Sequence, residues 1–184
     1  APDNEINGIT LAGVGRGTTV EFCEVAMNLD DGFEMFGGTV DLKHCVVVAV
    51  GDDAFDTDNG YQGRGQFLLV VRADDSDKGH EMDNATGGDL DSQPRSHPHF
   101  ANVTVISSPS HGEDALRLRE GTGGDFRNYI IHGANDGVRN DENGSEVVTQ
   151  DWATAEAAGH PDYLYISGSI IMNGLADVPW DDFD

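Results

Sequence analysis

The sequence LDDGFEMF (residues 29–36) decides the fold, because an acidic pair followed by alternating side chains returns along the chain. In GDDAFDTD (51–58) the acidic pair lies 22 residues later, and in SDKGHEMD (76–83) the turn follows after 25 more. Two further copies, GEDALRLR (112–119) and NDGVRND (135–141), again lie 22 residues apart. Such a regular return is typical of stacked structural repeats.

Each repeat alternates between two kinds of side chain. One position is mostly apolar and holds Phe33, Phe55, His80, Leu116 and Val138. The next position is charged and holds Glu34, Asp56, Glu81, Arg117 and Arg139. Alternation with a period of two predicts a half-buried β-strand, with the first set facing a core and the second facing outward.

A second strand precedes each acidic turn, as in TTVEFCEVAM (18–27) and TVDLKHCVVVAV (39–50). One such unit cannot bury its own apolar face, but stacked units share a continuous core. Propeller blades need about 40 or more residues per repeat, so they do not fit this spacing. The sequence predicts an all-β, right-handed parallel β-helix, a solenoid of about six to seven rungs. We expect it to form a single domain over residues 1–184, as part of a longer chain.

Two segments depart from the repeat. The polar stretch GGDLDSQPRSHPH predicts an inserted loop at residues 88–99. The alanines of DWATAEAAGHPD predict a short helical insert at residues 150–160. The opening residues contain no signal peptide, and no apolar run reaches about 18 residues, so we expect no membrane insertion.

The chain is strongly acidic, with a formal net charge of −24 and only two lysines, Lys43 and Lys78. Binding the phosphates of nucleic acid requires basic clusters, so nucleic acid is not an expected partner. The acidity has two interpretations. It is either a solvated surface suited to an extracellular medium or a surface that binds divalent cations.

The predicted register stacks carboxylates. Neighbouring rungs lie about 4.8 Å apart, which brings Glu34, Asp56 and Glu81 into one outward column. Each neighbouring pair then repels by about 3.5 kcal/mol at an effective dielectric of 20, or about 0.9 kcal/mol in water. Arg117 and Arg139 continue the column and are candidate partners for Glu81 only. Bound cations are one way to relieve the repulsion between the other carboxylates of the column.

Calcium is the expected cofactor, because it prefers six to eight hard oxygen ligands and the turns place many carboxylates beside the column. No single loop matches a known calcium motif, so the site is expected to be built across rungs. The predicted ligands are Asp30, Asp31, Glu34, Asp52, Asp53, Asp56, Asp58, Glu81 and Asp83.

Cysteines and histidines offer other chemistry. Cys23 and Cys45 lie one rung apart, either as stacked core thiols or as a disulfide between rungs. His97 and His99 alternate around a proline and could ligate a transition metal, although no third ligand is evident. His80 falls in the apolar column, which favours a core histidine with its hydrogen bonds satisfied.

Several long motifs carry a family resemblance, namely APDNEINGITLAGVGRGTTVEF (1–22), DDGFEMFGGTVDLKH (30–44), GDDAFDTDNGYQGRGQF (51–67) and GHEMDNATG (79–87). They resemble large secreted bacterial β-helix proteins, broadly pectate-lyase-like in architecture. The resemblance covers residues 1 to about 130 well. It implies an exported or surface-anchored protein with further sequence before Ala1, but it implies no particular reaction.

Two functions remain open. The first is an extracellular or cell-surface module, stabilised by calcium, for adhesion, glycan contact or assembly with other copies. Tyr61, Phe36, Trp152 and Tyr163 are its candidate stacking platforms for sugars. The alternative is a polysaccharide lyase or glycoside hydrolase. A lyase would need its base from Arg117, Arg119 or Arg139, and a hydrolase would use a carboxylate pair such as Asp56 and Glu81.

Overall fold

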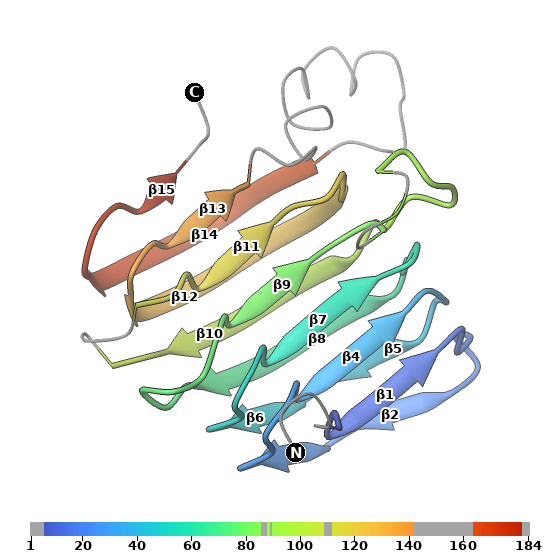
Figure 1. Ribbon diagram of the computed structural model, residues 1–184, viewed down its shortest axis with the longest axis horizontal. Helices are drawn as coiled ribbons and strands as arrows, with labels where there is room; N and C mark the ends of the chain where they lie inside the picture. Colours follow the sequence, from blue (N-terminus) through green and yellow to red (C-terminus); the bar gives the residue numbers. More distant parts are fainter. Residues whose placement is uncertain (1–5, 86–87, 89, 109–111, 142–163, 182–184) are drawn as a thin grey trace.

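The computed structural model is a parallel β-helix whose first and last rungs lie at opposite ends (Figure 1). It describes residues 6–85, 88, 90–108, 112–141 and 164–181. Within those ranges the regular structure is entirely β-strand. The helical insert predicted at 150–160 lies outside the described residues.

Two sheets make up the solenoid. Seven strands form sheet A, in the order β1-β4-β7-β9-β11-β13-β15. Their bounds are Ile9–Ala12, Phe33–Phe36, Phe55–Asp58, His80–Met82, Leu116–Leu118, Val138–Asn140 and Trp180–Asp181. Eight strands form sheet B, in the order β14-β12-β10-β8-β5-β2, with β3 and β6 paired beside that path. Their bounds are β2 Thr19–Glu21, β3 Glu24–Ala26, β5 Asp41–Lys43, β6 Val46–Val48, β8 Arg64–Val71, β10 His99–Ile106, β12 Gly124–Ala134 and β14 Leu164–Leu175.

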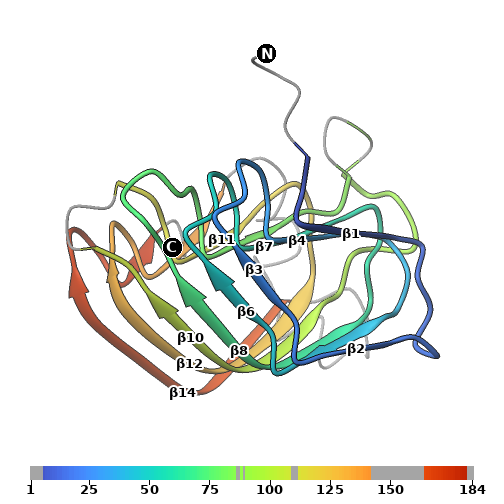
Figure 2. The same cartoon turned by 90° about the horizontal axis from the view of Figure 1, so that it is seen from below.

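The strand register confirms the predicted columns. Every pair in sheet A is parallel, and the Cα partners follow the repeat without a slip. Glu34 pairs with Asp56, and Asp56 pairs with Glu81. Arg117 and Arg139 then continue the outward column. The sheets face each other when the molecule is seen from below (Figure 2). The buried apolar side chains of both sheets form one core cluster.

Aromatic side chains fill the middle of the core. Phe33 and Phe55 are fully buried, and their rings stack with centroids 5.2 Å apart and planes 13° from parallel. Phe100 and Phe126 approach from sheet B, also fully buried. Burying a side chain of this size contributes about 2–3 kcal/mol to the free energy of folding. The strand register places each ring against the ring of the next rung.

His80 occupies the same column and is completely buried, as expected for a core histidine. Its ring lies 5.3 Å from that of Phe55 and 5.2 Å from that of Phe100. However, neither ring nitrogen has a hydrogen-bond partner among the described residues, so the expectation of a satisfied histidine was wrong. Burial in apolar surroundings lowers the pKa of His80 to about 3, because the charged imidazolium cannot be solvated there.

A residue with positive φ bends the middle of each of the first five rungs of sheet B. In the first three rungs this residue is Phe22, His44 or Phe67, with φ of 57°, 54° and 58°. In the next two it is Asn102 or Asn128, and the Asn128 side-chain amide donates to Asn102 Oδ1 at 3.3 Å. Asparagine tolerates the left-handed region better than phenylalanine does. The first three rungs therefore carry exposed rings where the later rungs carry a hydrogen-bonded ladder.

The cysteines form no disulfide. Cys45 is buried and Cys23 is half-buried, and both are free thiols, one rung apart. The Cys45 thiol lies 3.5 Å from the Lys43 carbonyl oxygen. Of the two alternatives, the structure has stacked core thiols.

Replacing His80 by leucine is expected to make the fold more resistant to acid. Between about pH 3 and the unfolded-state pKa near 6.5, His80 is protonated in the unfolded chain but stays neutral in the folded protein. The free energy of unfolding therefore falls as the pH falls. At about pH 4.5 this costs about 2–3 kcal/mol. Urea unfolding of both proteins at pH 7 and pH 4.5 measures the difference. An equal loss of stability in His80→Leu would contradict the assignment.

Candidate functional site

Aspartates in the turns before sheet A connect one rung to the next. Asp31 Oδ1 accepts a hydrogen bond from the backbone N–H of Asp53 at 3.0 Å. Asp53 Oδ1 accepts one from the N–H of Lys78 at 2.6 Å, and Asp136 Oδ1 one from the N–H of Val178 at 3.0 Å. One carboxylate oxygen of each aspartate is thus used structurally. The second oxygen is left for other partners.

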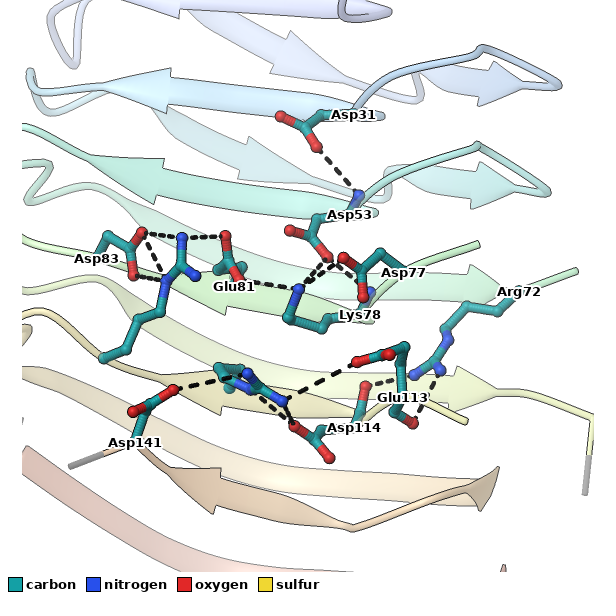
Figure 3. A network of polar contacts seen from close by, with 12 residues as sticks. Asp31, Asp53, Arg72, Asp77, Lys78, Glu81, Asp83, Glu113, Asp114 and Asp141 are labelled. Atoms are coloured by element: carbon teal, nitrogen blue, oxygen red, sulfur yellow. Dashed lines mark hydrogen bonds and ion pairs between the residues drawn. The ribbon is translucent and has the colours of Figure 1, made fainter. Parts of the chain in front are cut away.

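Lys78 interrupts this aspartate column and was missed by the sequence reasoning. Its buried ammonium lies 2.7 Å from Asp77 Oδ2, 3.0 Å from Glu81 Oε1 and 3.8 Å from Asp53 Oδ1 (Figure 3). These carboxylates outweigh the effect of burial and hold the pKa of Lys78 above its ordinary value. The signal was present in the sequence, because Lys78 aligns with Asp31 and Asp53 in the repeat.

Arginines compensate the carboxylates of the later rungs. Arg119 binds Glu81 Oε2 at 2.7 Å and Asp83 Oδ1 at 2.9 Å. Arg117 instead binds Asp114 at 2.5 Å and reaches Asp141 at 3.6 Å. The expectation that Arg117 would pair with Glu81 was therefore wrong. Figure 3 shows the carboxylates that these arginines bind, Glu81, Asp83, Asp114 and Asp141.

The earlier rungs gather carboxylates densely, and protein cations compensate only some of them. Four clusters of acidic side chains have possible ligand oxygens within 4.8 Å of one another. They are Asp30–Asp31–Asp52, Asp31–Glu34–Asp56, Asp52–Asp53–Asp77 and Asp56–Glu81–Asp83. Eight of the nine predicted ligands fall in these clusters, and Asp77 joins them. Asp58 falls in none, and its carboxylate accepts hydrogen bonds from the Asn59 N–H at 2.6 Å and the Asn59 side-chain amide at 3.1 Å.

Asp56 belongs to two of the clusters, as Asp31 and Asp52 also do. Its Oδ1 atom is buried and has no hydrogen-bond partner among the described residues. Glu34, one rung earlier, accepts a hydrogen bond from the side-chain amide of Asn7. Leaving a carboxylate oxygen buried and unpartnered costs about 1–3 kcal/mol, and more when it is charged. The Asp56 carboxylate is the least satisfied group of the acidic column.

The pKa values of these groups reflect the crowding. Burial, followed by the nearby Asp52 carboxylate, raises the pKa of Asp31 to about 8. Burial and the Asp77 carboxylate raise the pKa of Asp52 to about 6. Burial, together with Asp31 and Asp53, raises the pKa of Asp56 well above its ordinary value. At neutral pH Asp52 is mostly ionised, whereas Asp31 holds a proton unless a cation stabilises its charged form.

The donor set is suited to a hard divalent cation. Asp31 supplies a carboxylate from the turn before β4, Glu34 one from β4 and Asp56 one from the neighbouring strand β7. The register of β4 and β7 fixes the spacing of Glu34 and Asp56. Calcium accepts carboxylates at 2.3–2.6 Å and tolerates irregular coordination. No histidine or cysteine belongs to any of the four clusters within the described chain, which disfavours a soft transition metal.

Other predicted site residues lie apart from the acidic clusters or have different roles. The His97 and His99 rings are 4.8 Å apart, and His99 Nδ1 lies 3.6 Å from Asp125. Tyr61 is fully buried, and its hydroxyl donates to the Val40 carbonyl at 2.7 Å, so it is not a stacking platform. The proposed platforms Trp152 and Tyr163 lie outside the described residues.

The arginines do not support a lyase base. Burial lowers the pKa of Arg119, but the Asp83 and Glu81 carboxylates raise it more, so the pKa lies above its ordinary value. The pKa of Arg117 is likewise raised on balance, by Asp114 in particular, against the effect of burial. An arginine that acts as a general base needs a lowered pKa, so that it can lose its proton near neutral pH.

The structure is a parallel β-helix that carries the four acidic clusters, together called the acidic edge, on sheet A and in the turns beside its strands. A comparison with protein-family models matches residues 1–160 to the pectate-lyase-like β-helix domain, and the chain belongs to that family. Comparisons with curated proteins and with solved structures found no significant match. No helix among the described residues is long and apolar enough to cross a membrane.

Replacing Lys78 by methionine is expected to destabilise the fold by about 3–5 kcal/mol, because it leaves three carboxylates without their shared cation. Methionine keeps most of the buried volume. Lys43→Met is the matched control, since Lys43 forms no ion pair with a described carboxylate, and it should change stability by less than about 0.5 kcal/mol. Chemical denaturation in chelator measures both. Equal effects would mean that the Lys78 charge contributes nothing.

Proposed function

We propose that this chain is an extracellular β-helix module whose acidic edge binds calcium and whose long faces contact polysaccharide. The cation is held by Asp31, Glu34 and Asp56, with Asp52 and Asp30 as further carboxylates beside them. The unpartnered Asp56 oxygen is the observation that carries the calcium assignment. Pectate-lyase-like β-helix domains are typically extracellular, which supports the proposed location.

Calcium would act first as a structural ion. Stacking forces the carboxylates of successive rungs together, and their repulsion opposes folding. An ion that binds the folded column and not the unfolded chain reverses that effect. A proton is the competing solution, since the pKa of Asp31 is about 8. Calcium affinity should therefore rise with pH as the carboxylates ionise.

The first rung suggests a second kind of partner. β1 and β2 each pair on one side only within the described chain, and open strand edges invite pairing. Large apolar side chains are exposed near this end, among them Ile6, Met27 and Leu29, each more than three-quarters exposed. Upstream sequence or another copy of the chain would cover them in the assembled protein.

Calcium is expected to raise the melting temperature in solutions of matched ionic strength, and chelator to lower it. If free calcium is about 100 times its dissociation constant, the gain is about 2.7 kcal/mol. Asp56→Asn keeps the side-chain volume but removes the shared ligand charge, and it should lose most of this gain. Differential scanning calorimetry, with calcium and with chelator, measures the response.

Glu24→Gln is the control for a lost negative charge, because Glu24 is exposed on β3 of sheet B, outside every acidic cluster. It should respond to calcium like the unaltered protein. Identical melting curves with calcium and with chelator would remove the calcium proposal. The acidic edge would then be a protonated and solvated surface.

A further inference from the structure

The exposed arginines of this acidic chain gather in one place. Ten lysines and arginines offset 34 acidic residues. Of these ten, Arg72, Lys78 and Arg95 are buried in the turn networks. Four others line one groove on sheet B, namely Arg16, Lys43, Arg64 and Arg127. The three groove arginines have side chains that are 51%, 60% and 50% exposed.

The groove has a volume of about 520 Å³ and crosses five strands of sheet B. Parallel register arranges its outward side chains in two rows. One row holds Thr19, Asp41, Arg64, His99 and Asp125. The other holds Glu21, Lys43, Gln66, Ala101 and Arg127. Five strands extend about 19 Å along the solenoid axis, so the groove is shaped for a linear polymer lying across the strands.

The charges inside the groove are largely paired with one another. Asp41 accepts hydrogen bonds from Arg64 Nε at 3.1 Å and Arg64 Nη2 at 2.5 Å, and from Arg16 Nε at 3.3 Å. Asp125 accepts from Arg127 Nε at 2.6 Å and from Arg127 Nη2 at 2.5 Å. Forked pairs of this kind hold the guanidinium planes in place. The lining therefore presents fixed donors and acceptors side by side, with little net charge.

Such a lining matches hydroxyl groups better than it matches anions. A guanidinium has five N–H donors, and Arg64 uses its Nε and Nη2 groups on Asp41, so it keeps donors for a ligand. A carboxylate has about four acceptor positions. Asp41 fills them with hydrogen bonds from Arg16 and Arg64, whereas Asp125 accepts two from Arg127 and keeps positions for a sugar hydroxyl. A polyanion would meet three groove carboxylates and the −24 charge of the whole chain.

An apolar rim follows the groove. Phe22, His44 and Phe67 come directly after groove residues in their strands, and their rings stack with centroids 4.8 Å and 5.0 Å apart. Phe22 is 76% exposed and Phe67 46% exposed. Both hold positive φ, which is unusual for a bulky residue and marks a conformation kept at some cost. Exposed rings beside fixed polar pairs provide the two kinds of contact that a sugar ring makes.

We infer that this groove on the outer face of sheet B binds an uncharged linear polysaccharide. Arg64 and Asp125 bind its hydroxyls, Asp41 and Arg127 hold these two side chains in place, and the Phe22–His44–Phe67 stack contacts its apolar ring faces. The inference rests on the proposed polysaccharide-contacting function and names the surface and the ligand class. The groove is distinct from the acidic edge, because the acidic clusters lie on sheet A and in the turns beside its strands, whereas the groove lies on sheet B.

The test is affinity gel electrophoresis of the whole chain in calcium, with soluble polysaccharides in the gel. Mixed-linkage β-glucan, galactomannan, arabinoxylan and dextran are the neutral probes, and polygalacturonate is the anionic one. At least one neutral polymer should retard the protein, and 0.5 M NaCl should change that retardation by less than about twofold, since screening affects ion pairs most. Arg64→Gln and Phe67→Asn should each weaken the affinity about tenfold.

The variants are chosen to preserve the fold. Arg64 and Phe67 are exposed, and asparagine already holds the position of Phe67 in the next two rungs. Glu24→Gln, on the same sheet but outside the groove, should bind like the unaltered protein. Circular dichroism and melting temperature confirm that each variant is folded before its affinity is compared.

Three results would overturn the inference. They are binding of polygalacturonate alone, binding of none of the five polymers, and neutral binding that both groove variants leave unchanged. The calcium response is measured separately, so it can succeed when the groove assignment fails. Neutral binding lost in Asp56→Asn but kept in Arg64→Gln would retain the proposed function and move the glycan contact to the acidic edge.

Discussion

Parallel stacking is the constraint on which the rest of the structure depends. Strands about 4.8 Å apart in register force each side chain onto its equivalent in the next rung, whatever its chemistry. Apolar columns benefit, as when the rings of Phe33 and Phe55 stack in the core. Acidic columns do not, because Glu34, Asp56 and Glu81 meet at the same spacing. The fold must therefore resolve a repulsion that its own repeat creates.

The molecule resolves that repulsion differently along its length. From the third acidic turn onward, protein cations do so, with Lys78 between two rungs and Arg119 across Glu81 and Asp83. Before that turn no such cation reaches Asp31 or Asp56 among the described residues. The same stacking produces a separate result on sheet B, where oppositely charged residues pair within a groove instead of repelling. The same register thus produces an acidic edge in which some carboxylates lack a protein cation, and a polar groove in which positive and negative side chains are paired.

The sequence predicted the register well and the side-chain partners less well. Period-two alternation at constant spacing fixes which residues stack, so the columns were correct from Phe33 to Val138. It does not fix where a long side chain reaches. Arg119 lies two positions beyond Arg117, yet its side chain binds Glu81 on the preceding strand of sheet A. Arg117 instead binds Asp114, in the turn before its own strand. Tyr61 was misplaced for a similar reason, because its position in a turn gave no alternation from which to predict that its ring points inward.

A crystal structure with calcium, using anomalous scattering, tests directly whether the acidic edge binds this ion. We expect an anomalous peak among Asp31, Glu34 and Asp56, with about six to eight oxygens at 2.3–2.6 Å and the Asp56 Oδ1 atom among them. A calcium-saturated crystal with no peak there would contradict the proposed calcium site. In that case the same carboxylates should lie within hydrogen-bond distance of one another, sharing protons in place of a cation.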